Sequence, residues 1–362
     1  MSDKSKFLVV ASGVKNPISG RFKVLINWAK GLNSNIFLTN SSFDQVDLET
    51  IAKGVNIIQL TKDELIEEIN KEDPTYVLID DRDLEIGHVL KNRKVISYVY
   101  PIHGLWGMPG LETKDLVGIS EKIKVGLYRN VPHYNLRKKY KRLETESFCV
   151  VAQSFTASGI LRYYYGINPS LVLYNPVDRS LFRPLNSIED KISSNEITLF
   201  LGSNNGDTDL QLIKETAHLA NELGFALNTF GYEKNLHYAT SNCENTHYFR
   251  RIPDAKLVEI FSRSRFVILP QLDEPASYVG IESISCGTPV ISRYADEAII
   301  SGVTGYSVNK ISFYNVIKNL SIKGIERAVY ERTISHSSNF DVVAESKQLN
   351  SYLERINNGV DR

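Results

Sequence analysis

The chain has 362 residues, a formal net charge of zero at pH 7, 42% hydrophobic residues and 23% charged residues. This length is too great for one compact core and suits two domains of ordinary size. The zero net charge gives no indication of nucleic-acid binding, and no apolar run reaches the roughly 18 residues of a membrane-spanning helix.

The first half of the chain alternates short apolar runs with longer amphipathic stretches. Short runs rich in β-branched residues, without period-two alternation, predict fully buried strands at 7–11, 35–39, 55–59, 76–79 and 95–99. Helices are predicted between them, including 22–32 and 62–70, and Thr61 with Glu64 forms a capping box for the second. Strands that alternate with helices predict βαβ units and a parallel sheet.

The same pattern begins again in the second half. Further strands are predicted at 147–152, 171–174, 197–201, 226–230, 266–269 and 289–292, with helices at 210–223 and 254–262. Residues 187–196 are polar and lack strong periodicity, so we interpret them as an interdomain linker. The result is two doubly wound halves whose ligands bind at the carboxyl ends of the strands, with the cleft between the halves as the default site.

The most informative stretch is 266–308, where a strand and a polar turn precede Glu274 and Pro275. The residues that follow are Ala276, Ser277, Tyr278, Val279, Gly280 and Ile281, then Glu282 and, after a short gap, Gly287-Thr288-Pro289-Val290-Ile291. Proline suits the first turn of a helix, so we expect a helix to begin near Ala276. Its first N–H groups, from about Ala276 to Val279, can receive a diphosphate because that helix end is positively polarised.

This stretch resembles the donor site of retaining GT-B glycosyltransferases, above all the GT4 family, also called glycosyl transferases group 1. The hallmark of that family is two glutamates separated by seven residues, followed by a small residue and Gly-x-Pro-Val-Ile. The resemblance implies that Glu274 binds sugar hydroxyls and that Glu282 binds the ribose diol. It places the diphosphate at the helix start, where Gly280 keeps the surface low.

Further segments resemble the same family in the same order. They are 171–178 with 182–184, Ser154 with 165–167, Glu297 with 302–306, and the closing segment 340–356. Near the start, Gly20 keeps the second glycine of the family's glycine-rich loop. The resemblance implies an α/β fold of the GT-B type, with two Rossmann-like domains facing across a cleft. We expect an acceptor domain at 1–176, a donor domain at 177–340, and a C-terminal helix in 341–362 that crosses back to the first domain.

The sequence departs from the family after the strand at 197–201. The family has a Gly-Arg loop with a lysine shortly after it, and these cations neutralise the leaving diphosphate. Here Gly202 is followed by Ser203-Asn204-Asn205-Gly206-Asp207, which contains neither cation. Arg251, which with Ile252 falls where the family contacts the nucleobase, is the leading substitute and Arg293 is the second. Solvated surface arginines are an equally good interpretation of both.

Two weaker motifs follow strands of the first half. His103 comes after the strand at 95–99, where related families often place a histidine that faces the donor sugar and the acceptor; a loop histidine satisfied by solvent is the alternative. Asp81-Arg82-Asp83 imitates a D-x-D metal motif, but the GT-B interpretation needs no metal. We therefore predict no metal site and no cofactor apart from the nucleoside-diphosphate sugar donor.

Residues 122–142 contain eight lysines and arginines and no acidic residue. Leu136, Tyr140 and Leu143 form a helical apolar stripe there, which favours a core-facing helix with a solvated basic face. The alternative is a patch for an anionic acceptor or a membrane surface.

Cys149, Cys243 and Cys286 are odd in number and widely spaced, which favours a reducing compartment. The first six residues also lack the apolar core of a signal peptide. We expect a cytoplasmic location, and peripheral contact with the inner face of a membrane is a hypothesis.

The sequence as a whole predicts a hexosyltransferase-like enzyme. It would move a sugar from a nucleotide-sugar to a glycan, lipid-linked or small-molecule acceptor, with retention, without a metal and without a nucleic-acid partner. Two alternatives remain: a GT-B enzyme that does not glycosylate, such as a sugar-nucleotide epimerase, and a catalytically degenerate partner protein.

Overall fold

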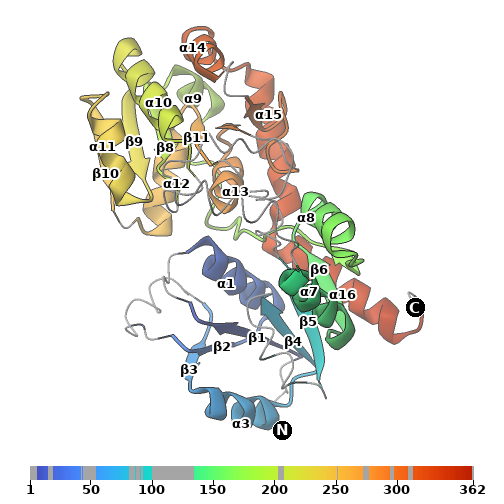
Figure 1. The fold of residues 1–362 in the computed structure, drawn as a ribbon. Coiled ribbons are helices and arrows are strands. Elements are labelled where there is room, and N and C mark those ends of the chain that lie inside the picture. The colour runs from blue at the N-terminus through green and yellow to red at the C-terminus, as the bar shows by residue number, and fades with distance from the viewer. Residues whose placement is uncertain are drawn as a thin grey trace. The chain divides into compact units, whose positions relative to one another are not determined.

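The structure is a computed structural model. It describes residues 6–14, 19–41, 43, 54–80, 86, 90, 93–99, 134–202, 208–250, 252–271, 277–293, 297–308 and 313–360. The chain forms two compact units (Figure 1). The first unit comprises Met1–Pro101, His133–Asp178 and Asn339–Arg362, and the second comprises Ile102–Pro132 and Arg179–Ser338.

The first unit contains a seven-stranded sheet in the order β3-β2-β1-β4-β5-β6-β7, and every pairing in it is parallel. The strands are β1 (Phe7–Ser12), β2 (Ile36–Thr39), β3 (Ile57–Leu60), β4 (Tyr76–Asp80), β5 (Lys94–Val99), β6 (Cys149–Ala152) and β7 (Leu171–Val172). Every residue of β2, β4 and β6 is buried, which explains why their sequences show apolar runs without alternation. The predicted doubly wound half is confirmed.

The helices of this unit are α1 (Gly20–Leu32), α3 (Lys62–Glu72), α7 (Tyr134–Glu146), α8 (Phe155–Ile160), the π-helix η2 (Leu161–Tyr165) and α16 (Val342–Asn357). Four of them, α1, α3, α8 and α16, begin after an N-cap residue whose side chain accepts a backbone N–H of the first turn. The capping box of α3 is present: Glu64 N–H donates to Thr61 Oγ1 at 3.3 Å, and Thr61 N–H donates to the Glu64 carboxylate at 2.7 Å. In α7, Tyr140 and Leu143 are buried while Lys138 is exposed, as the apolar stripe predicts.

The C-terminal helix α16 returns to the first unit and packs on α1. The two helices approach so closely at Gly31 that a Cβ there would lie 2.8 Å from the Val342 carbonyl oxygen. Glycine is therefore required for this contact and not for backbone conformation. Beside it, Tyr174 N–H donates to the buried Glu345 carboxylate of α16 at 2.9 Å, and Val177 bridges to Asp341.

The second unit contains a six-stranded parallel sheet in the order β10-β9-β8-β11-β12-β13. The strands are β8 (Glu196–Phe200), β9 (Ala226–Phe230), β10 (Thr246–Phe249), β11 (Val267–Leu269), β12 (Val290–Ser292) and β13 (Gly305–Ser307). Its longer helices are α10 (Leu210–Leu223), α12 (Asp254–Arg263), α13 (Tyr278–Ser285), α14 (Phe313–Lys323) and α15 (Arg327–His336). Short helices of this unit are α9 (Ile188–Ser193), η3 (Glu233–Asn235) and α11 (Leu236–Thr240), and η4 (Ser337–Phe340) spans the position in the chain where the unit ends.

The interpretation of residues 187–196 as an interdomain linker is wrong. A capping box of Ser187 and Asp190 starts helix α9 inside this segment, and Lys191 of that helix is fully buried. The helix is too short to show a periodic apolar pattern, so its polar composition was misleading.

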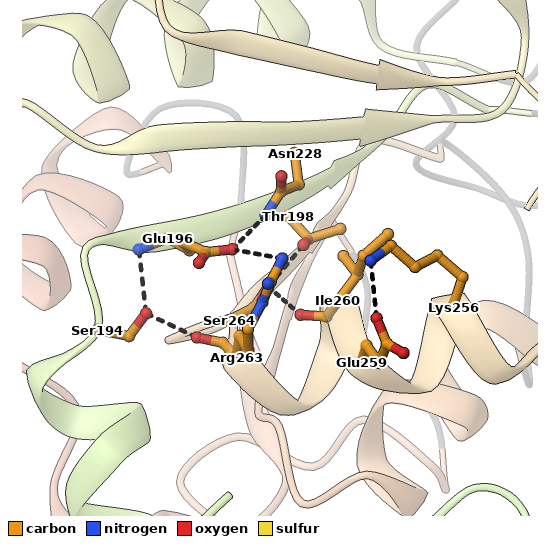
Figure 2. A network of polar contacts seen from close by, with 9 residues as sticks. All are labelled: Ser194, Glu196, Thr198, Asn228, Lys256, Glu259, Ile260, Arg263 and Ser264. Atoms are coloured by element: carbon orange, nitrogen blue, oxygen red, sulfur yellow. Dashed lines mark hydrogen bonds and ion pairs between the residues drawn. The ribbon is translucent and has the colours of Figure 1, made fainter. Parts of the chain in front are cut away.

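Polar contacts fasten the amino-terminal end of β8 to α12 (Figure 2). Glu196 accepts a hydrogen bond from Asn228 at 2.9 Å and pairs with Arg263 at 3.4 Å, while Ser194 donates to the Arg263 carbonyl at 2.6 Å. These contacts lie at the edge of the sheet opposite to the carboxyl ends of its strands. The amino-terminal ends of the strands are therefore held by structural contacts, and the carboxyl ends are left for ligands.

Glu345 makes the stability of the first unit depend on pH. Burial raises the pKa of Glu345 from 4.5 to about 8, although the hydrogen bond from the Tyr174 backbone opposes this shift. Between these two pH values the folded chain holds a proton that the unfolded chain has released. The free energy of unfolding therefore falls as pH rises across this window, by at most about 1.4 kcal/mol per pH unit.

We predict that Glu345→Gln removes this fall, because the amide oxygen still accepts the Tyr174 N–H but carries no titrating proton. The measurement is the free energy of unfolding in urea at pH 5, 6.5 and 8. Glu354→Gln, at an exposed position of the same helix, is the matched control and should follow the parent. Parallel pH profiles for the parent and Glu345→Gln would contradict the prediction.

Candidate functional site

Helix α13 is the centre of the candidate site. It begins at Tyr278 with Ser277 as its N-cap, two residues later than the predicted start near Ala276. Ser277 stands at the N-cap position without a side-chain hydrogen bond to the first turn of the helix. The first helical hydrogen bond runs from Ile281 N–H to the Ser277 carbonyl at 3.0 Å, so the N–H groups of Val279 and Gly280 precede the helical ladder.

Glu282 lies in the second turn of α13 and is 2% exposed. Its backbone carbonyl accepts the Cys286 N–H at 3.1 Å. Burial raises the pKa of the Cys286 thiol to about 12, and the nearby Glu282 carboxylate adds to that shift. A carboxylate this well shielded from water forms strong electrostatic interactions with any polar group that reaches it.

The start of α10, the helix that follows β8, is tied to the carboxyl end of β11 beside the start of α13. Asp209 N–H donates to the Pro270 carbonyl at 2.7 Å, and Thr208 forms an isolated bridge with Gln271. The Ser277 hydroxyl lies 3.4 Å from the Gln271 side-chain oxygen. A continuous row of contacts therefore joins the N-terminus of α13 to the N-terminus of α10.

An arginine that follows the neighbouring strand, β12, lies at the same end of the sheet. Arg293 follows β12 directly, and its guanidinium pairs with the Asp209 carboxylate. Asp209 is also the N-cap of α10, where its Oδ1 accepts the Leu212 N–H at 3.1 Å. The pair is largely shielded from water, with 14% of the Arg293 side chain and 3% of the Asp209 side chain exposed.

The structure gathers most of the predicted donor-site residues that it describes in the second unit. Those in or beside α13 are Ser277, Tyr278, Val279, Gly280 and Glu282, while Gly202 follows β8 and Ile252 follows β10. The described part of the first unit contains Gly20, the first residue of α1. The predicted residues Glu274, His103, Ala276 and Arg251, together with Asp81 and Asp83, lie outside the described residues.

Lys191 is a residue of this region that the sequence analysis missed. Its ammonium group donates to Thr288 Oγ1 at 2.6 Å and lies 3.4 Å from the Phe261 carbonyl at the end of α12. Thr288 in turn donates to the same carbonyl at 2.6 Å, and its own carbonyl accepts the Ser283 hydroxyl of α13 at 2.9 Å. Lys191 thereby holds the turn that follows α13, and a cation at the C-terminus of α12 is electrostatically favourable.

The burial of Lys191 has a measurable consequence. Burial lowers its pKa from 10.5 to about 8, and the nearby Cys286 opposes this shift. Between these two pH values the unfolded chain binds a proton that the folded chain has released. Lys191 therefore makes the free energy of unfolding rise with pH across this window.

We predict that Lys191→Met abolishes this contribution. From pH 8 to 10, the free energy of unfolding of the parent should rise relative to that of the variant by up to about 1.4 kcal/mol per pH unit. Urea unfolding at three pH values measures it, and Lys256→Met on α12, whose lysine pairs with Glu259 near the surface, is the control. A constant difference over this range would show that Lys191 does not titrate there.

Residues 199–312 match the family model described as glycosyl transferases group 1. No curated protein matched the chain. Among the described residues, no helix is both long and apolar enough to cross a membrane.

Solved structures similar to this chain cover nearly all of it at low sequence identity. HepE from Anabaena, solved with UDP and glucose, is 15% identical with a TM-score of 0.68, over 97% of this chain and 99% of that one. Sucrose-phosphate synthase from Thermosynechococcus elongatus is 12% identical with a TM-score of 0.70, over 98% and 99%. A glycosyltransferase from Rickettsia africae is 17% identical with a TM-score of 0.66, over 98% and 99%. The chain therefore has the GT-B fold of glycosyltransferases, and its second unit contains the segment that matches the glycosyl transferases group 1 family.

Proposed function

We propose that this protein transfers a sugar from a nucleoside-diphosphate sugar to an acceptor. The observation that carries the proposal is the position of Glu282, buried in the second turn of a helix that begins at the carboxyl edge of a parallel sheet. A helix start at this edge favours a diphosphate, and a shielded carboxylate beside it suits a ribose diol. The UDP and glucose in the HepE structure support a uridine donor as the first candidate.

The roles of the individual residues follow from this placement and from the family resemblance. The N–H groups at the start of α13 receive the diphosphate, Glu282 binds the ribose, and Glu274 positions the transferred sugar. Catalysis then depends on orientation of the two substrates and on stabilisation of the leaving diphosphate, without a covalent enzyme intermediate. Retention of configuration, hexosyl transfer and independence from metal ions belong to this proposal and rest on the resemblance.

The acceptor would be held by the N-terminal domain, residues 1–176, with His103 facing it. A glycan, a lipid-linked sugar or a small molecule suits that role. The basic segment 122–142 supports a further hypothesis of contact with an anionic membrane surface. In the part of α7 that belongs to this segment, Lys141 and Arg142 pair with Glu144 and Glu146, so part of its charge is already compensated.

One observation favours the alternative of a catalytically degenerate protein. The loop after β8, residues 202–209, contains no lysine or arginine but contains Asp207 and Asp209. A diphosphate bound there without another cation would be repelled. Nucleotide binding separates the two functions, because a degenerate protein without a donor site should bind none.

We predict that one of UDP, GDP, ADP, CDP and dTDP stabilises the protein against heat. At about 100 times its dissociation constant the ligand should add roughly 2.7 kcal/mol to the free energy of unfolding. Glu282→Ala should abolish this stabilisation because the ribose diol loses its acceptor. The absence of a response to all five nucleotides would support the degenerate protein or a donor without a nucleotide.

We also predict that the two glutamates differ in their kinetic effects. Glu282→Ala should raise KM for the donor, because its contact with the ribose exists before and during the reaction. Glu274→Ala should mainly lower kcat, because its contacts strengthen as the sugar leaves the diphosphate. Steady-state kinetics measures both parameters, with a sugar donor of the nucleotide that stabilises the protein most in the thermal panel. An equal loss of both parameters in both variants would contradict this division.

Product analysis with and without acceptor distinguishes a transferase from an epimerase.

A further inference from the structure

We propose that Lys191 is a positioning residue for the nucleotide donor: by holding the turn after α13, it fixes Glu282 where the ribose diol binds. This inference rests on the proposed function, in which Glu282 binds the ribose. Lys191 is fully buried at the far end of α13 from the helix start, so it acts without touching the donor.

The link to Glu282 begins at the next residue of the helix, Ser283. The Ser283 hydroxyl donates to the Thr288 carbonyl at 2.9 Å, and the Thr288 N–H donates back to the Ser283 carbonyl at 3.0 Å. These two hydrogen bonds tie the last turn of α13 to the turn that follows it. Because the helix has only eight residues, a shift at its end also moves its second turn, where Glu282 lies.

Thr288 is held in turn by Lys191. The Lys191 ammonium group donates to Thr288 Oγ1 at 2.6 Å, while the same hydroxyl donates to the Phe261 carbonyl at 2.6 Å. All three residues are fully buried, so solvent does not compete for these hydrogen bonds. Without the ammonium group, the Thr288 oxygen loses its donor in a region where an unsatisfied polar atom is costly, which favours a shift of the turn.

Lys191 and Glu282 also influence the same buried thiol. Cys286 is the C-cap of α13, and its N–H donates to the Glu282 carbonyl at 3.1 Å. Burial raises the pKa of the Cys286 thiol to about 12, and Lys191 lowers that pKa whereas Glu282 raises it. The ammonium group and the carboxylate therefore both lie within electrostatic reach of one sulfur atom.

Stability alone does not account for a lysine at this position. A buried ammonium group pays a desolvation penalty, and an apolar side chain of similar volume often packs in such a place equally well. The ammonium group adds direction, because it lies against two fixed oxygens, Thr288 Oγ1 and the Phe261 carbonyl. Helix α12, which ends near Phe261, contacts both α9 and α13, so this anchor belongs to the framework around the site (Figure 1).

The test measures how strongly the protein prefers a ribose diol. Calorimetry compares the ribonucleoside diphosphate that stabilises the protein most in the thermal panel with its 2′,3′-dideoxy analogue. The parent should prefer the ribonucleotide by at least about 10-fold, because the diol donates to a shielded carboxylate. Lys191→Met should lose most of this preference and change the affinity for the dideoxy analogue by less than about 2-fold.

Two further variants sharpen the comparison. Lys256→Met on α12 makes the same substitution at a lysine that pairs with Glu259 near the surface, and it should bind both ligands like the parent. Ser283→Ala cuts the link between α13 and Thr288 while leaving Lys191 in place, so it should also lower the preference for ribose. Combined with Lys191→Met it should lose no more than Lys191→Met alone, whereas independent effects would multiply.

Each result decides between distinct conclusions. An unchanged preference in folded Lys191→Met would overturn the inference and leave the proposed function intact, since Lys191 would then only stabilise the fold. An equal loss of affinity for both ligands would also overturn it. If Lys191→Met does not fold, Ser283→Ala decides by the same criteria. A parent protein that binds neither ligand would instead contradict the proposed function.

Discussion

The parallel register of β8, β11 and β12 is the constraint on which the candidate site depends. Parallel strands end at one edge of the sheet, and the residues that follow them must therefore meet. Here the backbone hydrogen bond from Asp209 to Pro270 ties the start of α10 to the end of β11, and Arg293, which follows β12, pairs with Asp209. Polar contacts at the opposite edge, around Glu196 and Arg263, fasten β8 to α12 and leave the carboxyl edge for chemistry.

Helix α13 is only eight residues long, so the contacts at its two ends decide where Glu282 lies. Near its start, Ser277 contacts Gln271, which itself bridges to Thr208. Beyond its end, Thr288 is held by the buried ammonium group of Lys191. A lysine placed in the interior costs free energy unless it gains compensating contacts. Its two oxygen partners at the turn after α13 supply that compensation and at the same time fix the turn.

The fold, and the helix that contains Glu282, could be predicted from the sequence because both depend on local patterns. Buried strands show as apolar runs, and α13 follows a proline and a serine that restrict where a helix can begin. Contacts between distant residues leave no such local signal. Asp209 and Arg293 are 84 residues apart, and Lys191 binds Thr288 across 97 residues. Helix α9 was missed for a related reason, since its polar sequence hides a lysine that is buried by tertiary contacts.

The missing cations after β8 illustrate how motif and geometry differ as evidence. A motif assigns a charge to a place in the sequence, whereas a ligand responds to a charge at a place in space. In a parallel sheet, any strand that ends on the ligand side can place a charged residue there, and Arg293, which follows β12 and pairs with Asp209, is one such residue. The loss of an arginine from one loop is then not sufficient evidence for a lost activity. Asp209 pairs with the Arg293 guanidinium and at the same time caps α10, the helix that follows β8.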